Sequence, residues 1–306
     1  MLSVLTQVYT DTFQSWQPQL GTSGGYDYQT IMEQSLLTIK VIRRLLIAGY
    51  EHPNRNPEVH DFWFLTIDHV RRLIDMLAQN KHLYPSTCTR LIEKHLLQFS
   101  KLHLDMARTH PAAFVLLPDS INLVRAYWSL TRQFAESFGA PDTVLSAAKN
   151  ARLGENGDQP DEKSVLEKLS LKGLLLVRAC VKMVFNATQT FKYAHAKDKE
   201  EKSQATNTVQ HDLLTDDFVK EIMNVIVTKF FVFRESDLRE WEEDPEDWER
   251  TADTESEGFE FSIRPCSEKL FLDLAIHYRS LVVQPLLDVF GVVASKSSSH
   301  LQKACC

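Results

Sequence analysis

The chain has 306 residues, of which 43% are hydrophobic and 25% are charged, a composition typical of a folded protein with a sizeable core. Ten glycines and eleven prolines are too few for the many tight turns of an all-β protein, so the composition favours helices. The net charge of −7 is concentrated locally, because residues 235–260 hold thirteen acids against two arginines and the rest of the chain is mildly basic.

Amphipathic helices are predicted along most of the chain. Between Tyr28 and Gly49, the apolar residues Ile31, Ile39, Ile42 and Leu46 share one stripe at helical spacing, and the glycine ends the helix. The same pattern predicts a short helix at 2–17 and longer ones at 58–79, 86–109, 118–138, 161–185, 214–231 and 265–287.

Most of the predicted helices have about twenty residues, and they form pairs that recur roughly every forty to sixty residues. This period is typical of a HEAT/armadillo-like α-solenoid, a superhelical array of antiparallel helix pairs. We therefore predict an all-α protein, with residues 1–306 forming a single solenoid segment of about four to five helix pairs. A compact helical bundle is the alternative. Polar stretches near 139–160 and 194–210 are predicted to be mobile loops.

The sequence gives no sign of secretion or of a membrane span. The N-terminal residues lack the basic region and apolar core of a signal peptide, and the most apolar run is interrupted by Arg178 and Lys182. We therefore expect a reduced, soluble, intracellular protein without membrane insertion. Cys88, Cys180 and Cys266 are accordingly predicted to be unpaired.

Catalytic, cofactor and metal motifs are absent from the sequence, so we predict that the protein is not an enzyme and uses no cofactor. The group closest to a metal site is His95, His103, Asp105 and His110, but the first two lie more than two helical turns apart. Surface or interhelical hydrogen bonding explains these residues better. The basic residues are scattered, which argues against direct binding of nucleic acid.

The stretch WEEDPEDWE, from Trp241 to Glu249, combines two tryptophans with a dense cluster of acids. Asp244 followed by Pro245 is a typical helix start, so we predict two short helical pieces hinged at Asp244. Trp241 and Trp248 are predicted to dock the segment on the solenoid or on a partner. The remaining side chains would then form a negative partner-binding surface: Glu242, Glu243, Asp244, Glu246, Asp247 and Glu249. A solvated loop is the alternative interpretation.

This stretch, followed by FSIRPCSEKLFLDL, resembles the importin-β (karyopherin-β) family of nuclear transport receptors, and within it the importin-eleven type. The first match is the block from Trp241 to Glu246. The second is an Arg-Pro-Cys block that leads into an apolar helix: Arg264, Pro265, Cys266, Glu268, Leu270 and Phe271. By this resemblance, residues 235–263 form an acidic insertion between solenoid helices; we call them the acidic segment.

The resemblance implies a function as well as a fold. It implies an internal HEAT-repeat segment of a receptor that carries protein cargo through nuclear pores in a cycle regulated by Ran-GTP. Expected partners are basic nuclear or ribosomal proteins, nuclear pore proteins and the Ran GTPase, whose main site would lie outside this segment. Such a receptor would be found in the cytoplasm, in the nucleus and at the nuclear envelope. A HEAT-repeat scaffold without transport activity is the alternative.

Overall fold

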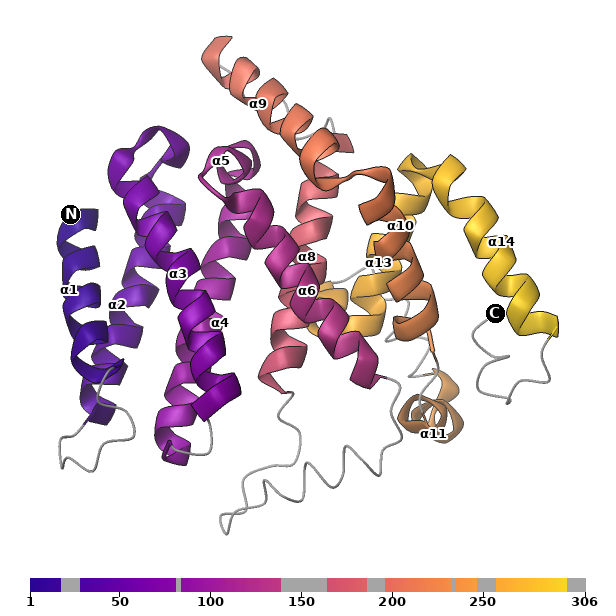
Figure 1. Ribbon diagram of the computed structural model, residues 1–306, viewed down its shortest axis with the longest axis horizontal. Coiled ribbons are helices and arrows are strands. Elements are labelled where there is room, and N and C mark those ends of the chain that lie inside the picture. The colour runs from indigo at the N-terminus through magenta and orange to yellow at the C-terminus, as the bar shows by residue number, and fades with distance from the viewer. Residues whose placement is uncertain are drawn as a thin grey trace. The chain divides into compact units, whose positions relative to one another are not determined.

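The computed structural model describes residues 1–17, 28–80, 84–138, 164–185, 196–232, 235–246 and 257–295. Within these ranges every regular element is a helix (Figure 1), which confirms the predicted all-α class. The chain divides into two compact units. Unit 1 comprises Met1–Leu123 and Ala187–Val209, and unit 2 comprises Val124–Asn186 and Gln210–Cys306. The sequence pattern alone did not predict this division.

Unit 1 is built from two stacked helix pairs. The first pair is α1 (Leu2–Trp16) with α2 (Tyr28–Gly49), and the second is α3 (Pro57–Asn80) with α4 (Ser86–Thr109). The helices α1 and α2 pack on each other, as do α3 and α4, and in addition α1 contacts α3 and α2 contacts α4. Each helix therefore lies against its equivalent in the next pair, which is the packing of an α-solenoid (Figure 1).

Aromatic side chains and histidines form much of the core of unit 1. Tyr9 of α1 is fully buried, and its hydroxyl lies 2.6 Å from Nδ1 of His69 on α3. Trp63 of α3 is also fully buried and donates its indole N–H to the hydroxyl of Ser120, 3.1 Å away. Because each polar atom named here has a hydrogen-bond partner, the cost of removing these groups from water is offset and the large side chains can fill the interior.

Unit 1 is completed by short elements and by a helix from far along the chain. The short elements are η2 (Pro53–Arg55) and α5 (Pro111–Leu116), and the distant helix is α9 (Ala196–Thr208), which packs on α5. The predicted mobile loop at 194–210 is therefore wrong. Its polar residues form a helix because they are held by tertiary contacts, which the local composition did not reveal.

Unit 2 repeats the stacked arrangement. It contains most of α6 (Ser120–Phe138), α8 (Val165–Phe185), α10 (Asp216–Val225) and α13 (Ile263–His277). Thr131 of α6 donates its hydroxyl to the Ser170 carbonyl of α8, 3.1 Å away, and α8 packs on α13. The rings of Trp128 on α6 and Phe218 on α10 meet edge to face at 5.9 Å. Two π-helical turns, η5 (Val209–Leu213) and η6 (Ile226–Phe230), flank α10.

Two predicted helix boundaries are corrected by the structure. The predicted helix 118–138 begins later, at Ser120, because Asp119 has a positive φ of 60° that is incompatible with the helix. The predicted helix 265–287 is two helices, α13 and α14 (Arg279–Ser295), separated at Tyr278. At this break the ring of His277 stacks on Phe185 of α8, with 4.0 Å between the centroids.

The other sequence predictions concern the cysteines, membrane-spanning helices and the loop at 139–160. Cys88 and Cys180 are buried free thiols, as predicted, and burial raises the pKa of the Cys180 thiol to about 12. Cys266 is fully buried. No single described helix is long and apolar enough to cross a membrane; α13 and α14 reach that length and composition only as a pair bent by 119°. The predicted loop at 139–160 lies outside the described residues.

Candidate partner-binding surface

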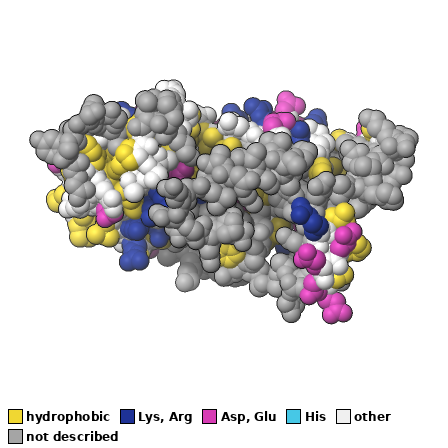
Figure 2. Space-filling model, turned by 90° about the horizontal axis from the view of Figure 1, so that it is seen from below, with side chains coloured by type: hydrophobic (Ala, Val, Ile, Leu, Met, Phe, Trp, Pro, Cys, Tyr) yellow, Lys and Arg dark blue, Asp and Glu magenta, His cyan; other side chains and the backbone are white. Residues whose placement is uncertain are grey.

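The described part of the acidic segment begins with the short helix α11 (Glu235–Glu243). Asp244 is not helical, whereas Pro245 and Glu246 are, so the break predicted at Asp244 is present; the rest of the predicted second helical piece lies outside the described residues. All six residues from Trp241 to Glu246 are exposed, and Figure 2 shows acidic side chains gathered at α11. The structure therefore brings Glu242, Glu243, Asp244 and Glu246 together on one short, solvent-exposed stretch.

Trp241 does not have the buried position that an anchor on the solenoid would require. Its side chain is 47% exposed, and it lies in the last turn of α11 between acidic neighbours. Of the two docking sites predicted for this residue, the solenoid and a partner, the exposed position favours the partner. The predicted site residues Asp247, Trp248 and Glu249 lie outside the described residues.

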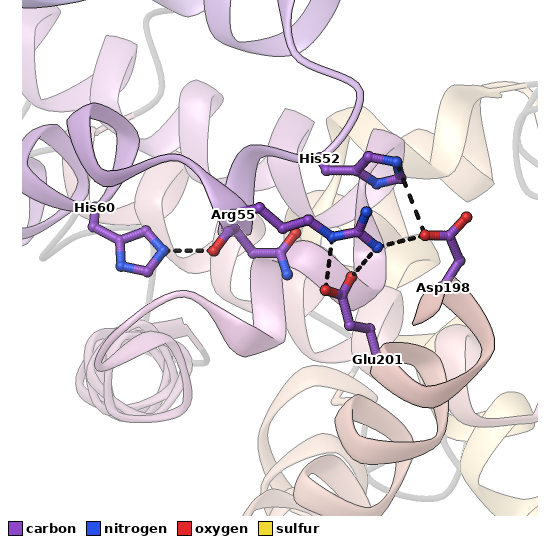
Figure 3. A network of polar contacts seen from close by, with 6 residues as sticks. His52, Arg55, His60, Asp198 and Glu201 are labelled. Atoms are coloured by element: carbon purple, nitrogen blue, oxygen red, sulfur yellow. Dashed lines mark hydrogen bonds and ion pairs between the residues drawn. The ribbon is translucent and has the colours of Figure 1, made fainter. Parts of the chain in front are cut away.

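Unit 1 contains a polar cluster that the sequence did not predict. Arg55 of η2 donates Nε to Oε1 of Glu201 at 2.8 Å and Nη2 to Oε2 at 3.0 Å, and it also bonds Asp198 (Figure 3). His52 Nε2 lies 3.9 Å from the Asp198 carboxylate. The hydrogen bond from Arg55 lowers the pKa of the Glu201 carboxyl. This cluster fixes α9 to η2.

The same cluster contains three side chains of types that bind metal ions. Ligand atoms of His52, Asp198 and Glu201 all lie within 4.8 Å of one another. However, Arg55 already donates to both carboxylates, so a divalent cation would have to displace a guanidinium and bind where that positive charge lies. The residues present therefore fit an ion-pair network better than a cation site.

The histidines and the aspartate that resembled a metal group serve packing instead. His95, His103, Asp105 and His110 all lie on α4 or at its end. Three of them make the predicted interhelical contacts: His103 with Thr66 at 3.0 Å, Asp105 with Arg43 at 3.1 Å, and His110 with the Ile47 carbonyl at 2.9 Å. His95 instead donates Nδ1 to the Leu91 carbonyl of its own helix, 2.7 Å away.

Arg178, which interrupts the most apolar run of the sequence, is a functional residue that the sequence analysis did not single out. Its side chain is only 11% exposed, and its Nε lies 2.7 Å from Asp273 of α13. Its guanidinium also lies over the ring of Phe259, 4.6 Å from the centroid. A largely buried arginine needs such a partner, and the position of Arg178 within the most apolar run of the sequence was the available signal.

Comparisons with known proteins cover nearly the whole chain. It is 26% identical to the importin beta-like protein KAP120 of Saccharomyces cerevisiae over 98% of its length, and 24% identical to human importin-11 over 92%. The importin beta-like protein kap113 of Schizosaccharomyces pombe is 21% identical over 94%. The chain is thus similar to part of these importin-β-like proteins, which confirms the resemblance to the importin-β family.

A solved structure supports the same importin-β-like fold. The structure of Lph2, described as a bidirectional nuclear transport receptor of S. cerevisiae, superposes on 99% of the chain with a TM-score of 0.75 and 23% identity. No family model matches the chain. The chain spans about a quarter of the length of the importin-β-like relatives: 27% of KAP120 and 25% of human importin-11. The fold class is thus the predicted α-solenoid.

Proposed function

We propose that the chain is part of a nuclear transport receptor, which binds protein cargo for import into the nucleus in a cycle regulated by Ran-GTP. The observation that carries this proposal is the similarity to importin-β-like proteins over 98% of the chain. The α-solenoid fold supports it, because stacked helix pairs offer extended surfaces for other proteins. The corresponding partners are protein cargo, the Ran GTPase and nuclear pore proteins, and the receptor would shuttle between cytoplasm and nucleus.

The transport cycle can be tested with the natural full-length protein. Proteins from a nuclear extract are bound to it, and Ran loaded with either GTP or GDP is then added. We expect Ran-GTP to release bound proteins and Ran-GDP to leave them in place, as quantified by mass spectrometry. Equal retention under both conditions would instead favour the alternative function, a HEAT-repeat scaffold without a transport cycle.

We further propose that the acidic segment contributes a surface for basic partners. The exposed acids Glu242, Glu243, Asp244 and Glu246 lie next to the half-exposed ring of Trp241, which suits a partner that combines positive charge with apolar contact. A single exposed ion pair contributes only about 0–1 kcal/mol, so no single carboxylate should dominate. The summed field of the cluster, however, should accelerate encounter with a positively charged partner.

Neutralising the cluster should therefore slow association without unfolding the protein. We expect the variant with E242Q, E243Q, D244N, E246Q, D247N and E249Q to bind a fluorescein-labelled oligolysine peptide about tenfold more slowly at low salt. The dependence of its association rate on salt should also be flatter, because screening over roughly 8 Å at physiological ionic strength acts on this attraction. Stopped-flow fluorescence at several salt concentrations measures both quantities.

A matched control separates the cluster from the total charge. The control variant neutralises six exposed acids that lie on other helices or loops: Asp11, Glu33, Glu51, Glu58, Asp61 and Asp75. It changes the net charge by the same amount, so its association rate should stay closer to that of the parent protein. If both variants slow association equally, the acidic segment acts only through net charge and is a solvated loop.

A further inference from the structure

The charged side chains of unit 1 are distributed unequally between its two helix layers. The layer formed by α1 and α3 carries two arginines against five acids, whereas the layer formed by α2 and α4 carries seven arginines and lysines against three acids. The second layer is therefore positively charged in a chain whose net charge is −7. Cations that are scattered in the sequence are brought together because α2 packs on α4.

Helical spacing places these cations on one side of each helix. Lys94 and Lys101 of α4 are seven residues apart, which is two turns or about 10 Å, and Arg90 lies one turn before Lys94. On α2, Lys40 and Arg44 are likewise one turn apart. All five side chains are exposed, whereas the core-facing side of each helix is buried. We call these five residues the basic face.

The cations of the two helices lie side by side. Arg43 of α2 bonds Asp105 of α4, 3.1 Å away and 62 residues later in the chain. A second contact, to the Ile47 carbonyl, has an offset of 63 residues, so the two helices run in the same direction. The same offset places Lys40 level with residue 102, next to Lys101. The basic face is therefore one continuous surface across both helices.

The five cations of the basic face differ from other arginines of unit 1. In the part of the chain that the structure describes, none of the five forms an ion pair. Three other arginines do: Arg43 with Asp105, Arg55 with Glu201, and Arg72 with Asp68. The positive charge of the basic face is therefore not compensated by neighbouring acids, and the face attracts a negatively charged partner.

Exposed aliphatic side chains next to these cations indicate the class of partner. Leu37 is 61% exposed and Val41 is 45% exposed, and each lies one helical turn before a cation of α2. A surface for single-stranded nucleic acid would instead offer aromatic side chains on which bases stack. The exposed residues of α2 and α4 include no aromatic side chain. Positive charge beside aliphatic contact area fits a protein segment that carries both acids and aliphatic residues.

We propose that the basic face binds an acidic protein segment, whose carboxylates pair with the five cations while its aliphatic side chains pack on Leu37 and Val41. The surface lies within unit 1, so this inference depends neither on the transport cycle nor on the role of the acidic segment. Because a single exposed ion pair is weak, binding depends on the whole set of cations.

The proposal can be tested with a fluorescein-labelled peptide of glutamates with interspersed leucines. We expect the full chain to bind this peptide at low salt, and the variant with K40Q, R44Q, K94Q and K101Q to bind it about tenfold more weakly. The matched control removes four exposed cations that lie on other helices: Arg71, Lys199, Lys220 and Arg279. Changed together to glutamine, these should weaken binding by less than about threefold. Fluorescence anisotropy measures the affinities.

A second variant tests the aliphatic contacts at constant charge. Leu37→Ser should weaken binding of the glutamate–leucine peptide by about threefold, because it removes exposed apolar contact area. Binding of an oligoglutamate peptide should not change in this variant. Circular dichroism verifies that each variant keeps its helices, as expected for changes at exposed positions.

Three results would overturn the proposal. If the full chain does not bind the peptide at low salt, the basic face is a solvated surface. If both fourfold variants weaken binding equally, the effect is one of net charge alone. If fluorescein-labelled oligothymidine binds as tightly as the peptide and is lost in the K40Q, R44Q, K94Q and K101Q variant, the face recognises phosphate groups instead. None of these measurements involves Ran, so they leave the test of the transport cycle unaffected.

Discussion

Lowering the pH from 7 to 5 should destabilise unit 1 strongly, because three histidines are buried there in the neutral state. Burial lowers the pKa of His69 to about 4, that of His95 to about 4 and that of His103 to about 3. An unfolded chain binds a proton at each histidine near pH 6.5. The unfolded state therefore takes up protons that the folded state excludes, and stability falls as the pH decreases from about 6.5 toward 4.

The expected effect is large. Each histidine should lower the free energy of unfolding by about 2 kcal/mol between pH 7 and pH 5, or roughly 6 kcal/mol for the three together. Carboxylates contribute mainly below this range, because their reference pKa values lie near 4. Urea unfolding followed by tryptophan fluorescence measures the change, and the buried Trp16 and Trp63 report on unit 1. A free energy of unfolding that stays constant over this range would contradict the prediction.

One variant isolates a single histidine. The hydroxyl of Thr66 donates to the Trp63 carbonyl at 2.7 Å, so Nε2 of His103 must be the donor in its 3.0 Å contact with that hydroxyl. A glutamine at position 103 can place an amide donor near the same point and does not titrate. We therefore expect His103→Gln to lose about 2 kcal/mol less between pH 7 and pH 5 than the parent. An equal loss in both proteins would assign the pH dependence to other groups.

Helices with a continuous apolar stripe and a clear stop could be predicted from the sequence. The bounds of α2 and α4 agree with the prediction at both ends, because Gly49 stops the first and the His110–Pro111 pair follows the second. The stacking of helix pairs also follows from helix length and spacing. In these cases the local pattern and the tertiary packing require the same residues to be buried.

Contacts between distant residues could not be predicted. The helix α9 buries little besides Ala205, and its attachment depends on Arg55, which lies 146 residues before Glu201. The break at Tyr278 was missed because apolar residues continue on both sides of it, as they would in one long helix. Whether a polar stretch forms a helix, and whether an apolar stretch forms one helix or two, depends on the elements that pack against it.

The candidate surface likewise has features that could be predicted from the local sequence and features that could not. Asp244 and Pro245 specify a helix start through their own chemistry, so the hinge was predictable. The exposure of Trp241 was not predictable, because the position of a tryptophan in the sequence does not determine which surface covers its side chain. The contacts of Arg264 with Val232 and of Arg178 with Phe259 join residues far apart in sequence, and only the fold brings them together.

Replacing Gly173 with alanine should destabilise unit 2, because the glycine of α8 lies close against Thr131 and Tyr127 of α6. A Cβ atom at this position would lie 2.3 Å from the hydroxyl oxygen of Thr131 and 2.8 Å from the carbonyl oxygen of Tyr127. The first contact would displace a hydroxyl that bonds the Ser170 carbonyl, and the second involves backbone, which cannot rotate away. The two helices would have to move apart, and this loosens the α6–α8 pair.

The balance of two opposing effects sets the size of this change. Alanine gains about 0.5–1 kcal/mol over glycine within a helix, whereas overpacking of a close contact costs about 1–3 kcal/mol and the lost hydrogen bond about 1 kcal/mol more. We therefore expect Gly173→Ala to lower the free energy of unfolding by about 2 kcal/mol. Gly291→Ala on α14 is the matched control, since its added methyl group would meet no atom within 4 Å and only the helical gain should remain. Urea unfolding of the two variants should thus shift in opposite directions, and a stabilised Gly173→Ala would show that α6 and α8 are not in close contact at this position.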